Sequence, residues 1–304
     1  MVAELALAQV QRRAGEVERP RPRAAPHDPP AVLKGGLDDL SQPDGPRPPE
    51  FAVPREVRRL YGPVGLLLLW TGLAAAGLIG ARIFPPPWEV LTAAATLTMN
   101  GQLQENLLAS LQRVALGSAF GLAIGLFLAV ISGTLRRLED IVDSLMQILD
   151  AVPNFTLVPL LIIWAGINEV PKVTLITLSV LMPIYINTYG GIRNVDQRLV
   201  EVARTLGLGY WSQVRHIVIP GALPNFFVGL RVALTNAWTA LVFAETINSQ
   251  KGLGALMSDA RSWWQLDIMV LVIVIYAILG LTTYTFVRLL ERSVLSWRRG
   301  FQGS

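Results

Sequence analysis

Side chains able to perform covalent or metal chemistry are scarce in this chain. Its 304 residues include no Cys and two His; His27 lies near the N-terminus and His216 far along the chain. A metal centre or a nucleophilic active site needs several such groups to converge on one point. The GxxxxGK[ST] phosphate loop is also absent, so we expect no ATP hydrolysis by this chain itself. The residue types favour binding and movement over catalysis, with no metal site and no cofactor held by this chain.

The segment Asp196–Pro224 is a polar and basic interruption between two long apolar runs. Asp196 can accept hydrogen bonds from the free amides of a following helical turn, and Gly207 supplies a left-handed stop. The predicted helix between them, of about three turns, has one apolar face with Leu199, Val200, Ala203 and Leu206. A second short helix is expected over 211–218. It should end before Pro220, with Pro224 opening the next helix.

The composition is that of a membrane protein. Hydrophobic residues make up 52% of the chain and charged residues 16%, with a mean hydropathy of +0.45, whereas soluble domains carry about 25% charged residues. From Tyr61 onward the apolar runs have the length that a bilayer requires of a helix, about 20 residues. We therefore predict an all-α integral membrane fold with six transmembrane helices, near 62–81, 110–133, 141–167, 173–191, 225–247 and 267–290.

Residues 1–54 differ from the rest of the chain, being rich in Pro, Arg, Asp and Gly without an apolar period. This composition predicts a disordered cytoplasmic tail, with partner binding as an open alternative. No short apolar core follows its charges, as it would in a secretory signal peptide. The expected organisation is a tail over 1–54 and a transmembrane domain over 55–304 with a cytoplasmic loop at 192–224.

Basic residues predict the orientation, because cytoplasmic segments of membrane proteins collect Lys and Arg. With the N-terminus inside, the cytoplasmic segments hold Arg55, Arg58, Arg59, Arg136, Arg137, Arg193, Arg198, Arg204, Arg215, Arg288, Arg292, Arg298 and Arg299. The external segments hold Arg82, Lys172, Lys251 and Arg261. We therefore expect a multi-pass protein of the cell (inner) membrane with both termini in the cytoplasm.

Glycine and proline positions predict how the spans pack. Gly117, Gly121 and Gly125 recur at four-residue spacing, which predicts a surface that another helix approaches closely. The third apolar run is interrupted by Pro153 and Pro159, so an amphipathic stretch is expected before a shorter membrane part.

Candidates for lining a pathway follow from proline in the spans, because irregular backbone at membrane depth is tolerated inside protein or beside a water-filled cavity. They are Pro153, Asn154, Tyr185 and Asn187, the last two just after Pro183. The alternative is that these prolines only kink helices for packing.

Polar and charged residues of the fifth run are further candidates. Arg231 either snorkels to the cytoplasmic surface or helps an anion to cross, and we favour snorkelling. Glu245 either caps the external loop or forms part of a gate; we favour structural pairing, because an isolated carboxylate repels anions. Asn236 and Trp238 face a cavity or pack between helices.

The spacing of Glu201, Ala203, Gly207, Ile217 and Pro220 resembles the Glu-Ala-Ala loop of ABC-importer permeases, with Val202 at the second alanine and Ile219 at the usual leucine. PIYINTYGGIRNVDQRLVEVARTLG, IPGALPNFFVGLR, AETINSQKGLG and LLERSVLSWRRGF resemble permeases of the aliphatic sulfonate, taurine, nitrate and bicarbonate group. Sulfonate permeases are the nearest. The resemblance covers residues 60 to 300 and implies a type I ABC-importer permease fold.

The resemblance also implies partners. The loop would dock into separate ATPase subunits, which hold ATP and Mg, through Glu201, Ala203, Gly207, Leu208, Ile217 and Pro220. A periplasmic or extracellular substrate-binding protein would dock outside, and a second permease copy would share the pathway. No nucleic acid partner is expected.

Two other classes of membrane protein are alternatives to an ABC-importer permease. An ion-coupled secondary carrier of small anions would normally show an internal repeat and paired carboxylates in mid-span. A membrane-embedded enzyme would need converging His, Asp or Glu residues. Neither pattern is evident in the sequence.

Overall fold

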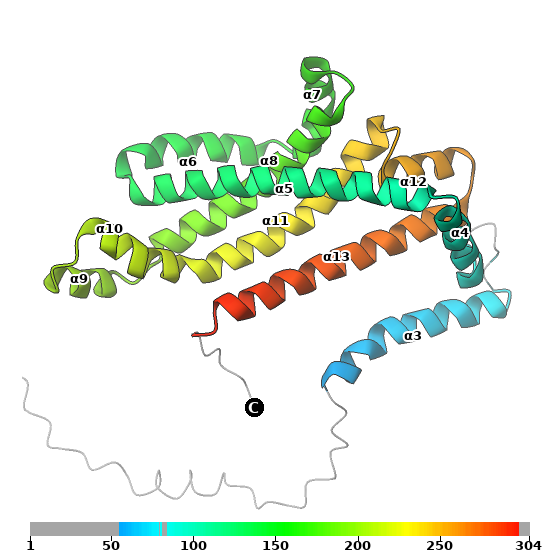
Figure 1. Ribbon diagram of the computed structural model, residues 1–304, viewed down its shortest axis with the longest axis horizontal. Coiled ribbons are helices and arrows are strands. Elements are labelled where there is room, and N and C mark those ends of the chain that lie inside the picture. Colours follow the sequence, from blue (N-terminus) through cyan, green and yellow to red (C-terminus); the bar gives the residue numbers. More distant parts are fainter. Residues whose placement is uncertain (1–54, 79, 81–83, 298–304) are drawn as a thin grey trace, which may run out of the picture. The chain divides into compact units, whose positions relative to one another are not determined.

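The computed structural model describes residues 55–78, 80 and 84–297, and in these ranges every regular element is a helix (Figure 1). The chain divides into two units, Met1–Leu60 and Tyr61–Ser304. Of the first unit the structure describes only the beginning of α3 (Arg55–Ala75). The predicted tail at 1–54 lies outside the described residues.

Four described helices are long and apolar enough to cross a membrane: α5 (Gln102–Thr134), α8 (Glu169–Arg193), a continuous helix over 210–247 and α13 (Leu266–Val294). A fifth span results if two segments that meet at 85° are taken together: Leu138–Ala151, in α6 (Arg136–Ala151), and Asn154–Ala165, which ends with α7 (Val158–Ala165). The all-helical membrane fold is therefore confirmed. The predicted number of six is not reached in the described residues.

The first predicted span corresponds to α3, whose apolar part, Tyr61–Ala75, is shorter than a span. Gly77 ends this helix early because it adopts a φ of +65°. Its N–H bonds to the carbonyl of Ala74 and the next N–H, of Leu78, reaches back to Leu73. This is the hydrogen-bond pattern of a glycine C-cap.

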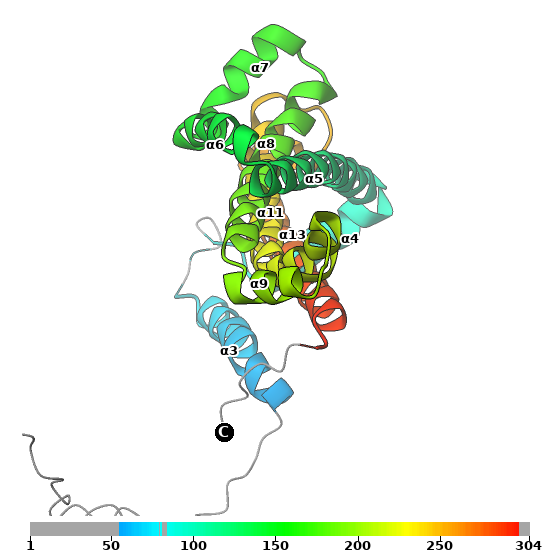
Figure 2. The same cartoon turned by 90° about the vertical axis from the view of Figure 1, so that its left-hand side faces the viewer.

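Helix α8 is packed between α5 on one side and α11 (Ile219–Asn248) on the other (Figures 1 and 2). The glycine stripe of α5 makes this approach possible. A Cβ added at Gly117 would lie 2.6 Å from the Cβ of Ile176, and one at Gly121 would lie 2.6 Å from the carbonyl oxygen of Thr177. The close helix–helix contact predicted from the glycine spacing is confirmed.

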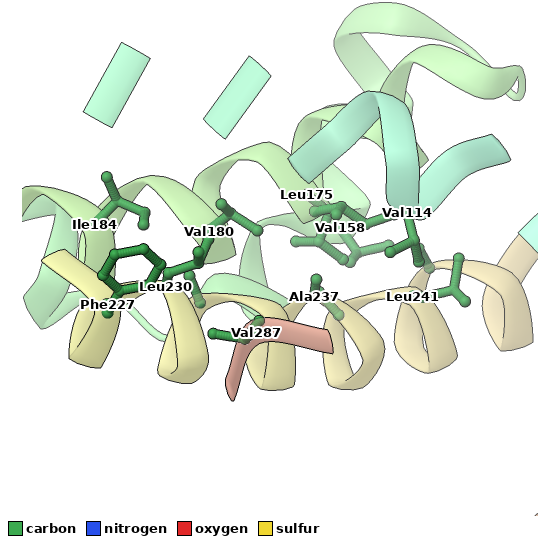
Figure 3. Packing of buried hydrophobic residues seen from close by; sticks show 14 residues of the cluster. Val114, Val158, Leu175, Val180, Ile184, Phe227, Leu230, Ala237, Leu241 and Val287 are labelled. Carbon is green, nitrogen blue, oxygen red and sulfur yellow. The ribbon is translucent and has the colours of Figure 1, made fainter. Parts of the chain in front are cut away.

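The largest cluster of buried apolar side chains lies along the contact between α8 and α11 (Figure 3). Figure 3 shows Val180 and Ile184 of α8 directed toward Phe227 and Leu230 of α11. Many outward-facing side chains of α5 and α13 are large, apolar and exposed, for example Phe127 and Phe286. This distribution suits helices whose outer surfaces meet lipid.

The third apolar run breaks at Pro153, as predicted. Helix α6 ends at Ala151, and a single 3-10 turn, η1 (Asn154–Leu157), leads into α7. Pro183 behaves differently, since α8 runs through it without a break. The side-chain amide of Asn187 donates to the carbonyl oxygen of Pro183 at 2.8 Å. Because Pro183 has no N–H, the carbonyl that lacks its helical partner is that of Ser179, four residues earlier, and not the one that Asn187 contacts.

The predicted helix end before Pro220 is wrong. Helix α10 (Tyr210–Gln213) passes through the π-turn η2 (Val214–Val218) directly into α11, with Pro220 in its first turn and Pro224 inside it. The N–H of Ile219 bonds to the carbonyl of Val214, five residues back. Because a π-turn is wider than an α-turn, it accommodates the proline ring and its missing N–H.

Candidate functional site

The loop between α8 and α11 carries a short helix with well-formed ends, α9 (Gln197–Thr205). Asp196 begins it by accepting a hydrogen bond from the N–H of Arg198 at 2.9 Å. Gly207, with a φ of +74°, ends it, and the next N–H, of Leu208, reaches back to the carbonyl of Ala203. Both ends were predicted from these residue types, and both are confirmed.

An apolar groove of about 460 Å³ lies between α9, the π-turn and Trp297, which follows α13. Its lining includes Leu199, Val202, Ala203, Leu208, Ile217, Pro220 and Trp297. Four of the predicted coupling residues, Ala203, Leu208, Ile217 and Pro220, therefore meet at one surface. Ala203 forms the buried floor of this groove, which we call the coupling groove, and is 3% exposed. Val202 and Leu206 are exposed on the same helix.

The remaining two predicted coupling residues lie beside the groove rather than in its lining. Glu201 is exposed on α9, and Gly207 forms the turn that follows this helix. The loop is also attached to the membrane helices, because the Tyr210 hydroxyl donates to the carbonyl of Thr134, at the end of α5, at 2.7 Å. The arrangement is a firmly held apolar surface that can bind a complementary protein.

At the other end of the helices, a charge network joins α5, α8 and α11, and its members Arg113, Lys172 and Glu245 are buried. The Nη1 of Arg113 lies 2.6 Å from Glu245 Oε1. Its Nε and Nη2 bind the two carboxylate oxygens of Glu169 at 2.6 and 2.9 Å. Lys172 donates to the same carboxylate at 3.0 Å. The structural pairing expected of Glu245 is present.

Glu245 also anchors the loop that follows α11. Its carboxylate, which is 0% exposed, accepts hydrogen bonds from the Ser110 hydroxyl at 2.8 Å and from the N–H of Gly254 at 2.8 Å. Arg113 donates to the carbonyl of Lys251 in this loop. Gly252 has a φ of +128°, and a Cβ there would collide with the Glu245 carboxyl group. A side chain at 252 is therefore excluded both by conformation and by space.

A cavity of about 170 Å³ with a mixed polar and apolar lining lies where η1, α8 and α11 meet. Two of the predicted pathway residues, Asn154 and Asn236, line it together with Phe155, Ser179, Thr239 and Phe243. Pro153 precedes this turn as the last residue before η1. Ser179 and Asn236 stand near the middle of their helices.

Arg231 and Trp238 line a second cavity, of about 250 Å³, between α11 and α13. The Arg231 guanidinium pairs with Glu291, near the end of α13, and lies 5.4 Å from the ring centroid of Tyr284. Trp238 donates from Nε1 to the Thr283 hydroxyl at 3.2 Å. Arg231 of α11 thus has a counter-ion on α13.

Tyr185 and Asn187 lie away from both cavities. Tyr185 is 1% exposed; its ring stacks on Tyr189, and its hydroxyl donates to Asp143 of α6. Asn187 packs against Gly229 of α11. In this structure both side chains help to hold α8 against its neighbours.

Comparison with known proteins identifies the family of this chain. Residues 121–296, which include every lining residue of the coupling groove except Trp297, match the family described as binding-protein-dependent transport system inner membrane component. The chain belongs to this family. It is a permease subunit of an ABC importer, which decides against the ion-coupled carrier.

The permease has close relatives among curated proteins. It is 42% identical over 239 residues to the putative aliphatic sulfonates transport permease protein SsuC of Escherichia coli, covering 79% of this chain and 91% of the relative. The SsuC protein of Bacillus subtilis is 38% identical over 253 residues, covering 81% and 92%. The taurine transport system permease protein TauC of Escherichia coli is 30% identical, covering 80% and 90%.

Solved structures support the fold of the permease. An inward-facing structure of the MetNI methionine ABC transporter has a TM-score of 0.57 at 19% identity, covering 65% of this chain and 97% of that one. The crystal structure of an amino acid ABC transporter with histidines has a TM-score of 0.54 at 19% identity, covering 66% and 97%. The type I importer permease fold expected from the resemblance is thereby confirmed.

Arg113 and Glu169 of the permease were not predicted from the sequence, although the two side chains bind each other in the charge network. The available signal was Arg113 itself, a charged residue at the start of an apolar run. Such a residue requires a counter-ion when it is buried. Its partners could not be named, because Glu169 and Glu245 lie 56 and 132 residues away in the chain.

Proposed function

We propose that this permease conducts small oxyanions into the cell, with aliphatic sulfonates as the principal substrates and taurine, nitrate and bicarbonate as members of the same class. The observation that carries the proposal is the 42% identity to an aliphatic sulfonate permease over 79% of the chain. Transport follows alternating access, in which the pathway opens to one side of the membrane at a time.

The energy comes from a separate ATPase subunit that holds ATP and Mg. The coupling groove supports this assignment, because it presents an exposed apolar surface beside a helix with rigidly defined ends. Buried Ala203 and the turn at Gly207 give the surface a compact outline. ATP-driven movement of the docked subunit is carried to α11, since α10 continues into that helix without a break.

The complex contains two copies of the permease around one pathway and an external substrate-binding protein. The distribution of Arg and Lys supports a cytoplasmic position for both termini and for the coupling groove. The charge network then lies at the external face, where it holds the loop at Lys251–Gly254 in place for the binding protein.

Reconstitution tests this function. The permease, its candidate ATPase and the candidate binding protein are placed in proteoliposomes, and uptake of radiolabelled ethanesulfonate is followed with and without ATP. We expect ATP-dependent uptake that excess taurine reduces and that a hydrolysis-deficient ATPase abolishes. ATP-dependent uptake of nitrate or bicarbonate without uptake of any sulfonate would reassign the substrate. Uptake driven by an ion gradient without the ATPase would contradict the importer function.

A further inference from the structure

The cavity at the meeting of η1, α8 and α11 combines neutral hydrogen-bonding groups with an aromatic wall. Asn154, Ser179, Asn236 and Thr239 provide the polar groups. Phe155 and Phe243 stack on each other with their ring centroids 5.4 Å apart and an interplanar angle of 25°. All of the side chains that line this cavity in the described structure are uncharged.

The amide groups have donors to offer a ligand. Ser179 donates its hydroxyl hydrogen to the carbonyl of Leu175 at 2.9 Å, and so can only accept from Asn154. The contact from Asn154 Nδ2 to Ser179 Oγ is long, at 3.4 Å, and each amide carries two N–H donors. Asn236 is exposed to the cavity from the opposite helix. Two amides from different elements thus face one space.

The aromatic wall offers the complementary chemistry. Phe155 is 52% exposed and Phe243 is 42% exposed, so both rings present free apolar surface at the cavity. A ligand that binds both the amides and the aromatic wall has oxygens at one end and a short hydrocarbon chain at the other. An alkanesulfonate has this form.

We propose that this cavity is the passage site for the sulfonate in the membrane, with Asn154 and Asn236 donating to the sulfonate oxygens and the alkyl chain lying on Phe155 and Phe243. The inference rests on the proposed function and names the residues that select substrate within it. Neutral donors suit a passage site, because an ion must be bound well enough to enter and weakly enough to leave. The amides give the sulfonate hydrogen bonds without the full ion pair that an Arg or Lys side chain would form with it.

The second cavity fits this role less well. Its cation, Arg231, is already paired with Glu291 and lies against Tyr284. An anion bound there would have to compete with a carboxylate of the same chain. Thr235 lines that second cavity and not the proposed passage site, and so provides a control position on α11.

The test compares alkanesulfonates of increasing chain length in the reconstituted complex. The binding protein is kept saturated, and the uptake rate of each compound is divided by the rate of ATP hydrolysis, so that differences in ATPase coupling cancel. For Phe243→Ala we expect the ratio of long-chain to short-chain uptake to fall by about threefold or more, because the alkyl chain loses part of the aromatic surface on which it lies. Thr235→Val should leave the ratio unchanged.

A second variant tests the polar end. Asn236→Asp places a negative charge beside the sulfonate and should lower uptake by about tenfold or more, while the loaded binding protein still stimulates ATP hydrolysis. Asn236→Gln, which keeps the donors, should retain most of the uptake. An unchanged chain-length ratio in Phe243→Ala together with normal uptake by Asn236→Asp would overturn the passage site alone. Absence of sulfonate uptake by the wild type would overturn the proposed function and this site together.

Discussion

The guanidinium of Arg113 and the carboxylate of Glu245 lie 2.6 Å apart, although 132 residues separate them in the chain. The pair joins the beginning of α5 to the end of α11, and the carboxylate also holds the N–H of Gly254 in the following loop. Neither side chain is more than 7% exposed. The pair therefore fixes the end of α11 and the loop that follows it against α5, which lies more than 100 residues earlier in the chain.

Glu245→Ala should strongly destabilise the permease. Glu169 would remain as a counter-ion to Arg113, but the buried Ser110 hydroxyl and the Gly254 N–H would lose their acceptor, at a cost of about 1–3 kcal/mol each. Thermal unfolding in detergent, followed by Trp fluorescence, measures the effect. Glu105→Ala is the matched control, because its partner Lys251 is 62% exposed and exposed pairs contribute about 0–1 kcal/mol. Equal midpoints for the two variants would contradict the structural importance of the pair.

Gly121→Ala should separate α5 from α8. The added Cβ would lie 2.6 Å from the carbonyl oxygen of Thr177, and forcing extra volume into a packed contact costs about 1–3 kcal/mol. Gly280→Ala, where a Cβ meets nothing within 4 Å, should be neutral or slightly stabilising. Thermal unfolding in detergent measures both variants. A Gly121→Ala protein as stable as Gly280→Ala would show that α5 and α8 do not pack closely at Gly121.

Gly207→Val should weaken binding of the ATPase while leaving the membrane helices folded. Residue 207 has a φ of +74°, and a side chain in that conformation costs about 1–2 kcal/mol. The strain would distort the end of α9 beside the coupling groove. Co-purification of a tagged permease with its ATPase provides the measurement. Gly209→Ala is the control, since Gly209 has a φ of −66° and should bind the ATPase normally.

Arg231 and Glu291 should prove energetically coupled. Glu291→Leu leaves the guanidinium half-buried without its counter-ion, whereas the double variant Arg231→Leu with Glu291→Leu removes both charges. A double-mutant cycle on the unfolding free energy should give a coupling of about 0.5–3 kcal/mol, as for other contacting residues. Strictly additive effects would show that the pair makes no net contribution, as is common for exposed ion pairs.

Local features of this protein were predictable because they depend on neighbouring residues. Asp196 and Gly207 define both ends of α9 through contacts within a few residues of each end. The glycines at 117, 121 and 125 likewise predicted a close contact with another helix, but not that this helix would be α8. The spans were located by hydropathy alone, although Gly77 ended the first one earlier than the apolar run suggested.

Features that depend on long-range packing were not predictable. The charge network needs the folded arrangement of α5, α8 and α11 before its members meet. The continuous passage from α10 into α11 was missed for a different reason. Pro220 normally indicates a helix boundary, and the wide turn over Val214–Val218 that accommodates it has no distinctive residue pattern.

The π-turn at Val214–Val218 also sets a rotational phase. Because the helix over Tyr210–Ile247 is 38 residues long, at 1.5 Å per residue it forms a rod of about 57 Å. Tilting such a rod by about 10° around its middle moves each end by about 5 Å. The one additional residue of the wide turn rotates everything beyond it by about 100° around the axis. The π-turn therefore sets the direction around the helix axis in which the coupling groove lies relative to Asn236. Deleting one residue there would make the same tilt of the helix move the groove toward a different side of the bundle.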